Sequence, residues 1–171
     1  GTGAITFLGC DMWQSTFTKG TGTGITTVNR LMMRDLSVVS HLTGTMTLNG
    51  VQCHVGNINQ NTNAGAIMSL TSTHVKQGAN ISNAATGTLS MTQSTLEINS
   101  VVRRVAGATG TLTVNTSRIS SNAIVSNEAT NTGNTSISQC EVIQGSNIFN
   151  RSAVTISMVR VLLDRASTVE T

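Results

Sequence analysis

The stretch GTLTVNTSRIS, residues Gly110 to Ser120, carries the pattern that decides the fold of this chain. Apolar and polar residues alternate from Leu112 to Asn115, which is the two-residue period of a β-strand with one buried face. The alternation then slips by one residue, so a chain continuing to Ile119 must bend to keep its apolar side chains inside. A slip that recurs along the chain would mark a repeated structural unit.

The slip recurs in eight segments that share the pattern apolar, any, apolar, any, any, small, any, apolar, with departures at the first and sixth positions. The segments are ITFLGCDM from Ile5, TTVNRLMM from Thr26, MTLNGVQC from Met46, MSLTSTHV from Met68, LSMTQSTL from Leu89, LTVNTSRI from Leu112, TSISQCEV from Thr135 and VTISMVRV from Val154. They begin about 21 residues apart. Their third positions form a predicted core column: Phe7, Val28, Leu48, Leu70, Met91, Val114, Ile137 and Ile156. Their eighth positions form another: Met12, Met33, Cys53, Val75, Leu96, Ile119, Val142 and Val161.

A weaker apolar column follows about ten residues after the first. Its members are Phe17, Val38, Ile58, Ile81, Val102, Ile124, Ile148 and Ala166. Gly tends to precede the next segment, as at Gly24, Gly44, Gly65, Gly87, Gly110 and Gly133. We therefore expect each unit to hold two or three short strands joined by tight turns.

A unit of this length leaves no room for a crossover helix between strands. The chain can instead wind as a coil, in which each strand pairs in parallel with the same strand one turn later, about 4.8 Å away. Parallel crossovers are right-handed in nearly all cases, which predicts a right-handed coil. In the quoted stretch the bend falls at 115–116, and the side chains on either side of it are predicted to face inward: Leu112, Val114, Ser117 and Ile119.

The composition favours a single all-β domain over residues 1–171. Val, Ile and Thr are plentiful, Pro and Tyr are absent, and 38% apolar against 10% charged residues disfavours disorder. No apolar run approaches the roughly 18 residues of a membrane span. Because the chain starts with Gly1 and no charged-then-apolar leader opens it, we expect a processed product or a fragment of a longer protein.

From Ile5 to about Val161 the segments resemble the coils of the right-handed parallel β-helix family, the pectate-lyase-like solenoids. The resemblance implies an all-β solenoid of about eight rungs with roughly 21 residues per rung. The family includes polysaccharide lyases and hydrolases, phage tailspikes, viral fibres and adhesins. Its polysaccharide-cleaving members use clustered Asp or Glu residues as general acid and base or as calcium ligands.

The acidic residues do not form such a cluster in the repeat register. They are Asp11, Asp35, Glu97, Glu128, Glu141, Asp164 and Glu170. Asp11 and Glu141 share a column, but six rungs apart. Opposite charges stack instead, in one outward column of Arg118, Glu141 and Arg160 and in another of Lys76 and Glu97. We interpret these columns as solvated ladders that keep the rungs in register.

The sequence predicts no metal or cofactor site. Cys53 and His54 are adjacent, so on a strand they point to opposite faces and cannot readily share a metal. All three histidines are expected on the surface: His41, His54 and His74. The cysteines are predicted to face inward on rungs too far apart for disulfides: Cys10, Cys53 and Cys140. Unpaired buried thiols favour folding in a reducing compartment.

The possible partners follow from charge and aromatic content. A net charge of +3 is too small to predict nucleic-acid binding, and few aromatic side chains are present to stack on bases. Trp13 is expected to point outward on the first rung, where it would contact a glycan or pack against a cap or a neighbouring chain.

These observations predict a non-catalytic structural protein, a rod in a viral or phage fibre, spike or capsid-associated surface assembly that contributes to host attachment. It would fold in a reducing cytoplasm and then stand on the virion or an extracellular surface. Open β edges need cover, which predicts that flanking domains, self-association or other structural proteins cover the ends of the rod. The resemblance implies a homo-oligomer such as a trimer. A host-surface glycan is the expected ligand. The alternatives are a polysaccharide lyase or hydrolase whose site is completed by flanking regions or another protomer, and a secreted glycan-binding adhesin.

Overall fold

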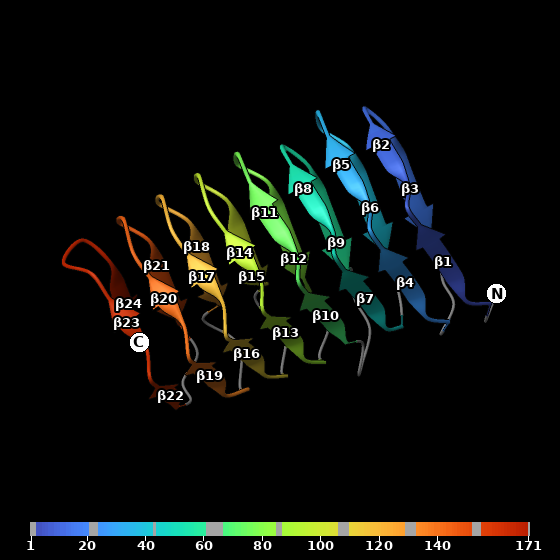
Figure 1. Cartoon of the computed structure of the whole chain (residues 1–171). Coiled ribbons are helices and arrows are strands. Elements are labelled where there is room, and N and C mark those ends of the chain that lie inside the picture. The colour runs from blue at the N-terminus through green and yellow to red at the C-terminus, as the bar shows by residue number, and fades with distance from the viewer. Residues whose placement is uncertain are drawn as a thin grey trace.

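The computed structural model describes residues 3–20, 24–42, 44–60, 67–84, 87–105, 110–128, 133–151 and 155–170. They wind as an all-β parallel solenoid of about seven turns with about 21 residues per turn. Three parallel sheets run the length of the molecule, each with eight strands (Figure 1). We call one strand from each sheet a rung and number the rungs from the N-terminus.

Each sheet contains every third strand of the chain. The first sheet, along the lower edge of Figure 1, contains β1 (Ile5–Leu8), β4 (Thr26–Asn29), β7 (Met46–Asn49), β10 (Met68–Thr71), β13 (Leu89–Thr92), β16 (Leu112–Asn115), β19 (Thr135–Ser138) and β22 (Ile156–Val159). The second contains β2 (Asp11–Trp13), β5 (Met32–Arg34), β8 (Gln52–His54), β11 (His74–Lys76), β14 (Thr95–Leu96), β17 (Arg118–Ile119), β20 (Glu141–Val142) and β23 (Leu162–Leu163). The third contains β3 (Thr16–Lys19), β6 (Val38–His41), β9 (Asn57–Gln60), β12 (Asn80–Asn83), β15 (Val101–Arg104), β18 (Ile124–Asn127), β21 (Asn147–Asn150) and β24 (Thr168–Glu170).

The slip in the alternation is a left-handed residue at the corner between the first and second sheets. Thr116 has φ 47°, and the buried side chains of Val114 and Ser117 lie on either side of this bend. A residue with positive φ stands at this corner in every rung: Gly9, Arg30, Gly50, Ser72, Gln93, Thr116, Gln139 and Arg160. Single left-handed residues reverse the inward and outward sides of the strand that follows, which is what the sequence pattern predicted.

The predicted core column is confirmed for seven rungs and wrong in the eighth. Phe7 to Ile137 pair in the predicted order, but the next partner is Met158 rather than Ile156. Ile156 pairs with Thr135. Ile156 and Met158 are two residues apart on the same strand, so both are apolar residues on the same side of it. The alternation of apolar and polar residues therefore could not show which of the two pairs with Ile137.

The other predicted columns need similar corrections. The same shift puts Leu163 opposite Val142 in place of Val161. In the third sheet the inward residues are Val39, Val125 and Val169, where Val38, Ile124 and Ala166 were expected. The other predicted members of both columns pair in the predicted order, those of the eighth-position column in the second sheet and those of the weaker column in the third.

A column of polar side chains is buried where the third sheet ends. It contains Lys19, His41, Gln60, Asn83, Arg104, Asn127 and Asn150. Lys19 Nζ donates to the Gly24 carbonyl oxygen at 2.6 Å, and Arg104 donates to the Gly87 carbonyl oxygen at 2.8 Å. A buried polar group is stable only when hydrogen-bonded, so these donors satisfy the backbone that leads into the next rung. The expectation of a surface His41 is therefore wrong, because His41 belongs to this column and is fully buried.

Candidate functional site

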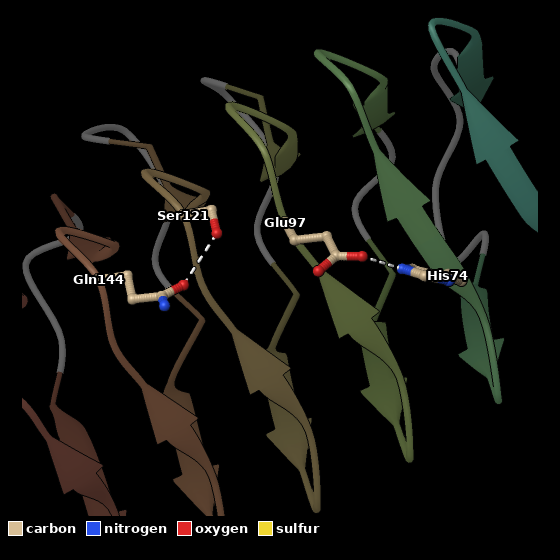
Figure 2. A network of polar contacts seen from close by, with 4 residues as sticks. All are labelled: His74, Glu97, Ser121 and Gln144. Atoms are coloured by element: carbon tan, nitrogen blue, oxygen red, sulfur yellow. Dashed lines mark hydrogen bonds and ion pairs between the residues drawn. The ribbon is translucent and has the colours of Figure 1, made fainter.

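The outward side of the second sheet and its corners hold most of the ionisable groups that could form a site. His74 on β11 and Glu97, which follows β14, contact each other through Nε2 and Oε1 (Figure 2). Their side chains are 36% and 28% exposed, so the pair is partly screened from solvent. Glu97 follows Leu96, which pairs with Val75, so Glu97 lies on the rung after Lys76 as predicted. The Glu97 carboxylate nevertheless contacts His74, which lies two residues before Lys76.

His54 lies beside this pair among positive charges. Desolvation lowers its pKa from the usual 6.5, and the charges of Lys76, His74 and Arg34 lower it further. Nε2 of His54 is buried and has no hydrogen-bond partner among the described residues. These surroundings favour the neutral imidazole, and among the described residues no carboxylate is hydrogen-bonded to its Nε2 to activate it.

A shallow groove of about 440 Å³ follows the first corner over four rungs. Its lining is hydroxyl- and amide-rich: Ser72, Gln93, Ser94, Thr95, Thr116, Ser117, Arg118, Gln139 and Glu141.

The Nε of Arg118 lies 3.7 Å from Oε2 of Glu141, and both side chains are more than half exposed. Leu162 rather than Arg160 continues this column, so the predicted third charge is wrong. At the next corner, Ser121 donates to Gln144 Oε1 at 2.9 Å between neighbouring rungs (Figure 2).

Trp13 points outward, as predicted, and is 68% exposed. Its indole Nε1 donates to Oδ2 of Asp35 on the next rung. The ring borders a hollow of about 340 Å³ lined by Asp11, Met12, Trp13, Met32, Arg34 and Asp35. The hollow combines an aromatic surface with two carboxylates and a guanidinium, groups that can bind saccharide hydroxyls.

The acidic residues most relevant to polysaccharide cleavage lie near the C-terminal end. Glu141 and Asp164 stand diagonally on neighbouring rungs, because Glu141 pairs with Leu162. The Ser167 side chain and the backbone N–H of Gln144, which donates to Oδ2, both lower the pKa of Asp164. A general acid needs the opposite shift, so Asp164 is suited to remain a carboxylate. Another acid, Glu128, lies 3.9 Å from Arg151 on the next rung.

The thiols are not arranged as nucleophiles. Burial raises the pKa of Cys53 to about 12, and it also raises the pKa of Cys140. Both are free and buried, whereas Cys10 is free and only half-buried. A reactive cysteine requires a lowered pKa, so Cys53 and Cys140 serve as small core residues.

Within the described ranges, no group of three or more His, Cys, Asp or Glu residues is placed to hold a metal ion. No helix in that part of the chain is long and apolar enough to cross a membrane. Neither the contact between His74 and Glu97 nor the buried polar column was predicted from the sequence. In the repeat register His74 and Glu97 are diagonal to each other, so the register alone does not indicate a contact. The buried column could be predicted only by knowing which corner of the coil is closed to solvent.

Comparison with protein-family models, with curated proteins and with solved structures found no match to this chain.

Proposed function

We propose that this chain is a non-catalytic structural solenoid that forms a rod-like part of a surface assembly, such as a viral or phage fibre, spike or capsid-associated protein. The observation that carries the proposal is that the ion pairs of the described residues join neighbouring rungs. The pairs are His74–Glu97, Arg118–Glu141 and Glu128–Arg151. Ionisable groups placed in this way hold rungs in register rather than converging on one reacting centre.

The edges of the first and last rungs support an assembly role. Leu162 and Leu163 on the last rung are 58% and 41% exposed, and Leu8 on the first is 62% exposed. Uncovered strand edges with apolar side chains are sites of further pairing. We propose that they are covered by self-association, including a trimer, by other structural proteins or by flanking domains of a longer protein. The free buried thiols favour folding in a reducing cytoplasm before the rod reaches a virion or cell surface.

Two alternative functions rest on particular residues. The diagonal pair Glu141 and Asp164 would serve a polysaccharide lyase or hydrolase completed by another segment or protomer. The hollow beside Trp13 would serve a glycan-binding adhesin. The lowered pKa of Asp164 does not suit the proton donor of such a site, so Asp164 would be its base or nucleophile and another group would have to donate the proton.

An activity assay separates structure from catalysis. The chain and the variant Glu97→Gln/Glu141→Gln/Asp164→Asn are incubated with neutral and acidic polysaccharides, and reducing ends and unsaturated uronates are measured. We expect no product from either form. Product that the unsubstituted chain releases and the triple variant does not would refute the proposal, and circular dichroism of the variant checks that it is folded.

A further inference from the structure

The outward side of the first sheet differs in chemistry from the rest of the surface. Its middle column is made entirely of hydroxyl side chains: Thr6, Thr27, Thr47, Ser69, Ser90, Thr113, Ser136 and Ser157. The column after it contains Leu8, Asn29, Asn49, Thr71, Thr92, Asn115, Ser138 and Val159. The column before it, placed by backbone hydrogen bonds between rungs, contains Ala4, Ile25, Thr45, Ile67, Thr88, Thr111, Asn134 and Thr155. We call these three columns the hydroxyl face.

The hydroxyl face carries no charge, although the chain has ten Lys and Arg and seven Asp and Glu residues. The outward side of the second sheet, in contrast, carries both signs, as at Arg118 and Glu141. The face also exposes large apolar side chains, with Ile25 and Ile67 at 50% and 43%. Its polar groups are therefore hydroxyls and amides set among methyl groups.

The face is ordered in two directions. Equivalent side chains repeat about every 4.8 Å between rungs, and alternate residues along a strand lie about 6.6 Å apart. Like side chains on neighbouring rungs also bond to each other, since Ser90 Oγ donates to Ser69 Oγ at 3.2 Å and the hydroxyls of Thr88 and Thr111 lie 3.1 Å apart. The strands stack evenly along the molecule in Figure 1. The side-chain oxygen atoms thus form a grid on the sheet, which is interrupted at Ala4, Leu8, Ile25, Ile67 and Val159.

We propose that the hydroxyl face binds ice. The flat faces of hexagonal ice present rows of oxygen atoms with repeats similar to those of this grid in both directions. The threonine side chains of the face, such as Thr27, Thr47 and Thr113, have stiff χ1 angles, so their hydroxyl and methyl groups are held in place before binding and little ordering entropy is lost there. Waters bridging hydroxyls at such spacings can occupy lattice positions, whereas a charged group would impose its own hydration shell.

Other occupants fit the face less well. Protein interfaces are enriched in aromatic and Arg side chains at their centres, and the hydroxyl face has neither. A crystalline polysaccharide would favour an aromatic platform, but Trp13 lies on the second sheet. The proposal is independent of the rod's role in a surface assembly.

The test compares two variants with equal charge on the same two rungs. Thr47→Lys/Ser90→Lys places lysines on the hydroxyl face, and Gln52→Lys/Thr95→Lys places them on the outward side of the second sheet. The purified chain and both variants are partitioned between a slowly growing ice front and the liquid, and ice recrystallisation is followed by microscopy. We expect the unsubstituted chain and the second-sheet variant to enter the ice and slow recrystallisation. The hydroxyl-face variant should lose both properties.

A second variant guards against misfolding. Thr47→Tyr/Ser90→Tyr keeps β propensity and neutrality but adds side chains that protrude from the plane, and it should also lose ice binding. Exclusion of the unsubstituted chain from ice to the level of an inert protein would overturn the proposal. So would equal ice binding by all folded variants, binding to microcrystalline cellulose or chitin in place of ice, or dimerisation through this face in sedimentation experiments.

Discussion

At the scale of single residues, His54 shows how side chains on neighbouring rungs change the pKa of an imidazole. Desolvation and three neighbouring groups, Lys76, His74 and Arg34, all lower its pKa. In the unfolded chain these neighbours disperse and the pKa returns to about 6.5. Between the folded and unfolded pKa values the unfolded state therefore binds more protons, and the free energy of unfolding falls as the pH falls through this window.

We therefore expect the midpoint of thermal unfolding to decrease as the pH is lowered from 7.5 to below 6.5, and to decrease less in His54→Gln. The variant removes the group that must take up a proton against its surroundings. Lys76→Gln serves as a partial control, because it removes one cause of the lowered pKa and should weaken the dependence without abolishing it. Identical pH profiles for His54→Gln and the unsubstituted chain would contradict this account.

Residue type alone predicted some positions and misplaced others. Trp13 was correctly placed on the outside, because no inward column included it. His41 was misplaced, because a polar side chain normally indicates solvent exposure. The corner after the third sheet instead requires buried donors for its backbone carbonyls, as Arg104 shows. The need for these buried donors arises from the packing of the coil, so the pattern of apolar residues in the sequence does not indicate it.

At the scale of strands and corners, the buried polar column is an element in its own right. Asn127 Nδ2 donates to the Gly133 carbonyl oxygen at 3.3 Å, to Thr135 Oγ1 at 2.8 Å and to Asn150 Oδ1 at 3.1 Å. Thr135 Oγ1 in turn donates to Asn150 Oδ1 at 2.9 Å. One amide thus connects the end of β18 to the start of β19 and to the next rung.

Asn127→Ala should lower the free energy of unfolding by about 2 kcal/mol or more, because it leaves buried partners without their donor. Asn49→Ala, on the exposed side of the first sheet, is the matched control and should change it by less than about 0.5 kcal/mol. Chemical denaturation monitored by circular dichroism measures both. Equal effects of the two substitutions would show that the column does not stabilise the corner.

The strands were predicted correctly where the alternation of apolar and polar residues agreed with the repeat spacing of about 21 residues. The coil and the bend at 115–116 were predicted from the slip in the alternation, whereas the third strand of each rung was left open and the left-handed φ of Thr116 is seen only in the structure. The eighth rung was shifted by two residues because Ile156 and Met158 are both apolar and of the same parity. The contact between His74 and Glu97 was missed because a diagonal pair depends on side-chain length as well as register.

At the scale of the whole molecule, a solenoid is a one-dimensional stack in which each rung contacts only its neighbours. Such a stack opens from its ends, so local unfolding should expose terminal rungs before central ones. The three free cysteines report on this directly. Cys10 lies on the first rung, Cys53 on the third and Cys140 on the seventh.

Native-state alkylation followed by mass spectrometry should modify Cys10 first, Cys140 second and Cys53 last. Cys10 is half-buried, whereas the other two are closed to solvent and become accessible only when rungs separate. Cys140 lies one rung from the C-terminal end and Cys53 two rungs from the N-terminal end, so Cys140 requires the smaller opening. Alkylation in denaturant, where all three should react alike, controls for intrinsic reactivity. A single rate for all three thiols in native buffer would mean that the stack opens only as one cooperative unit, and faster modification of Cys53 would contradict the rung order itself.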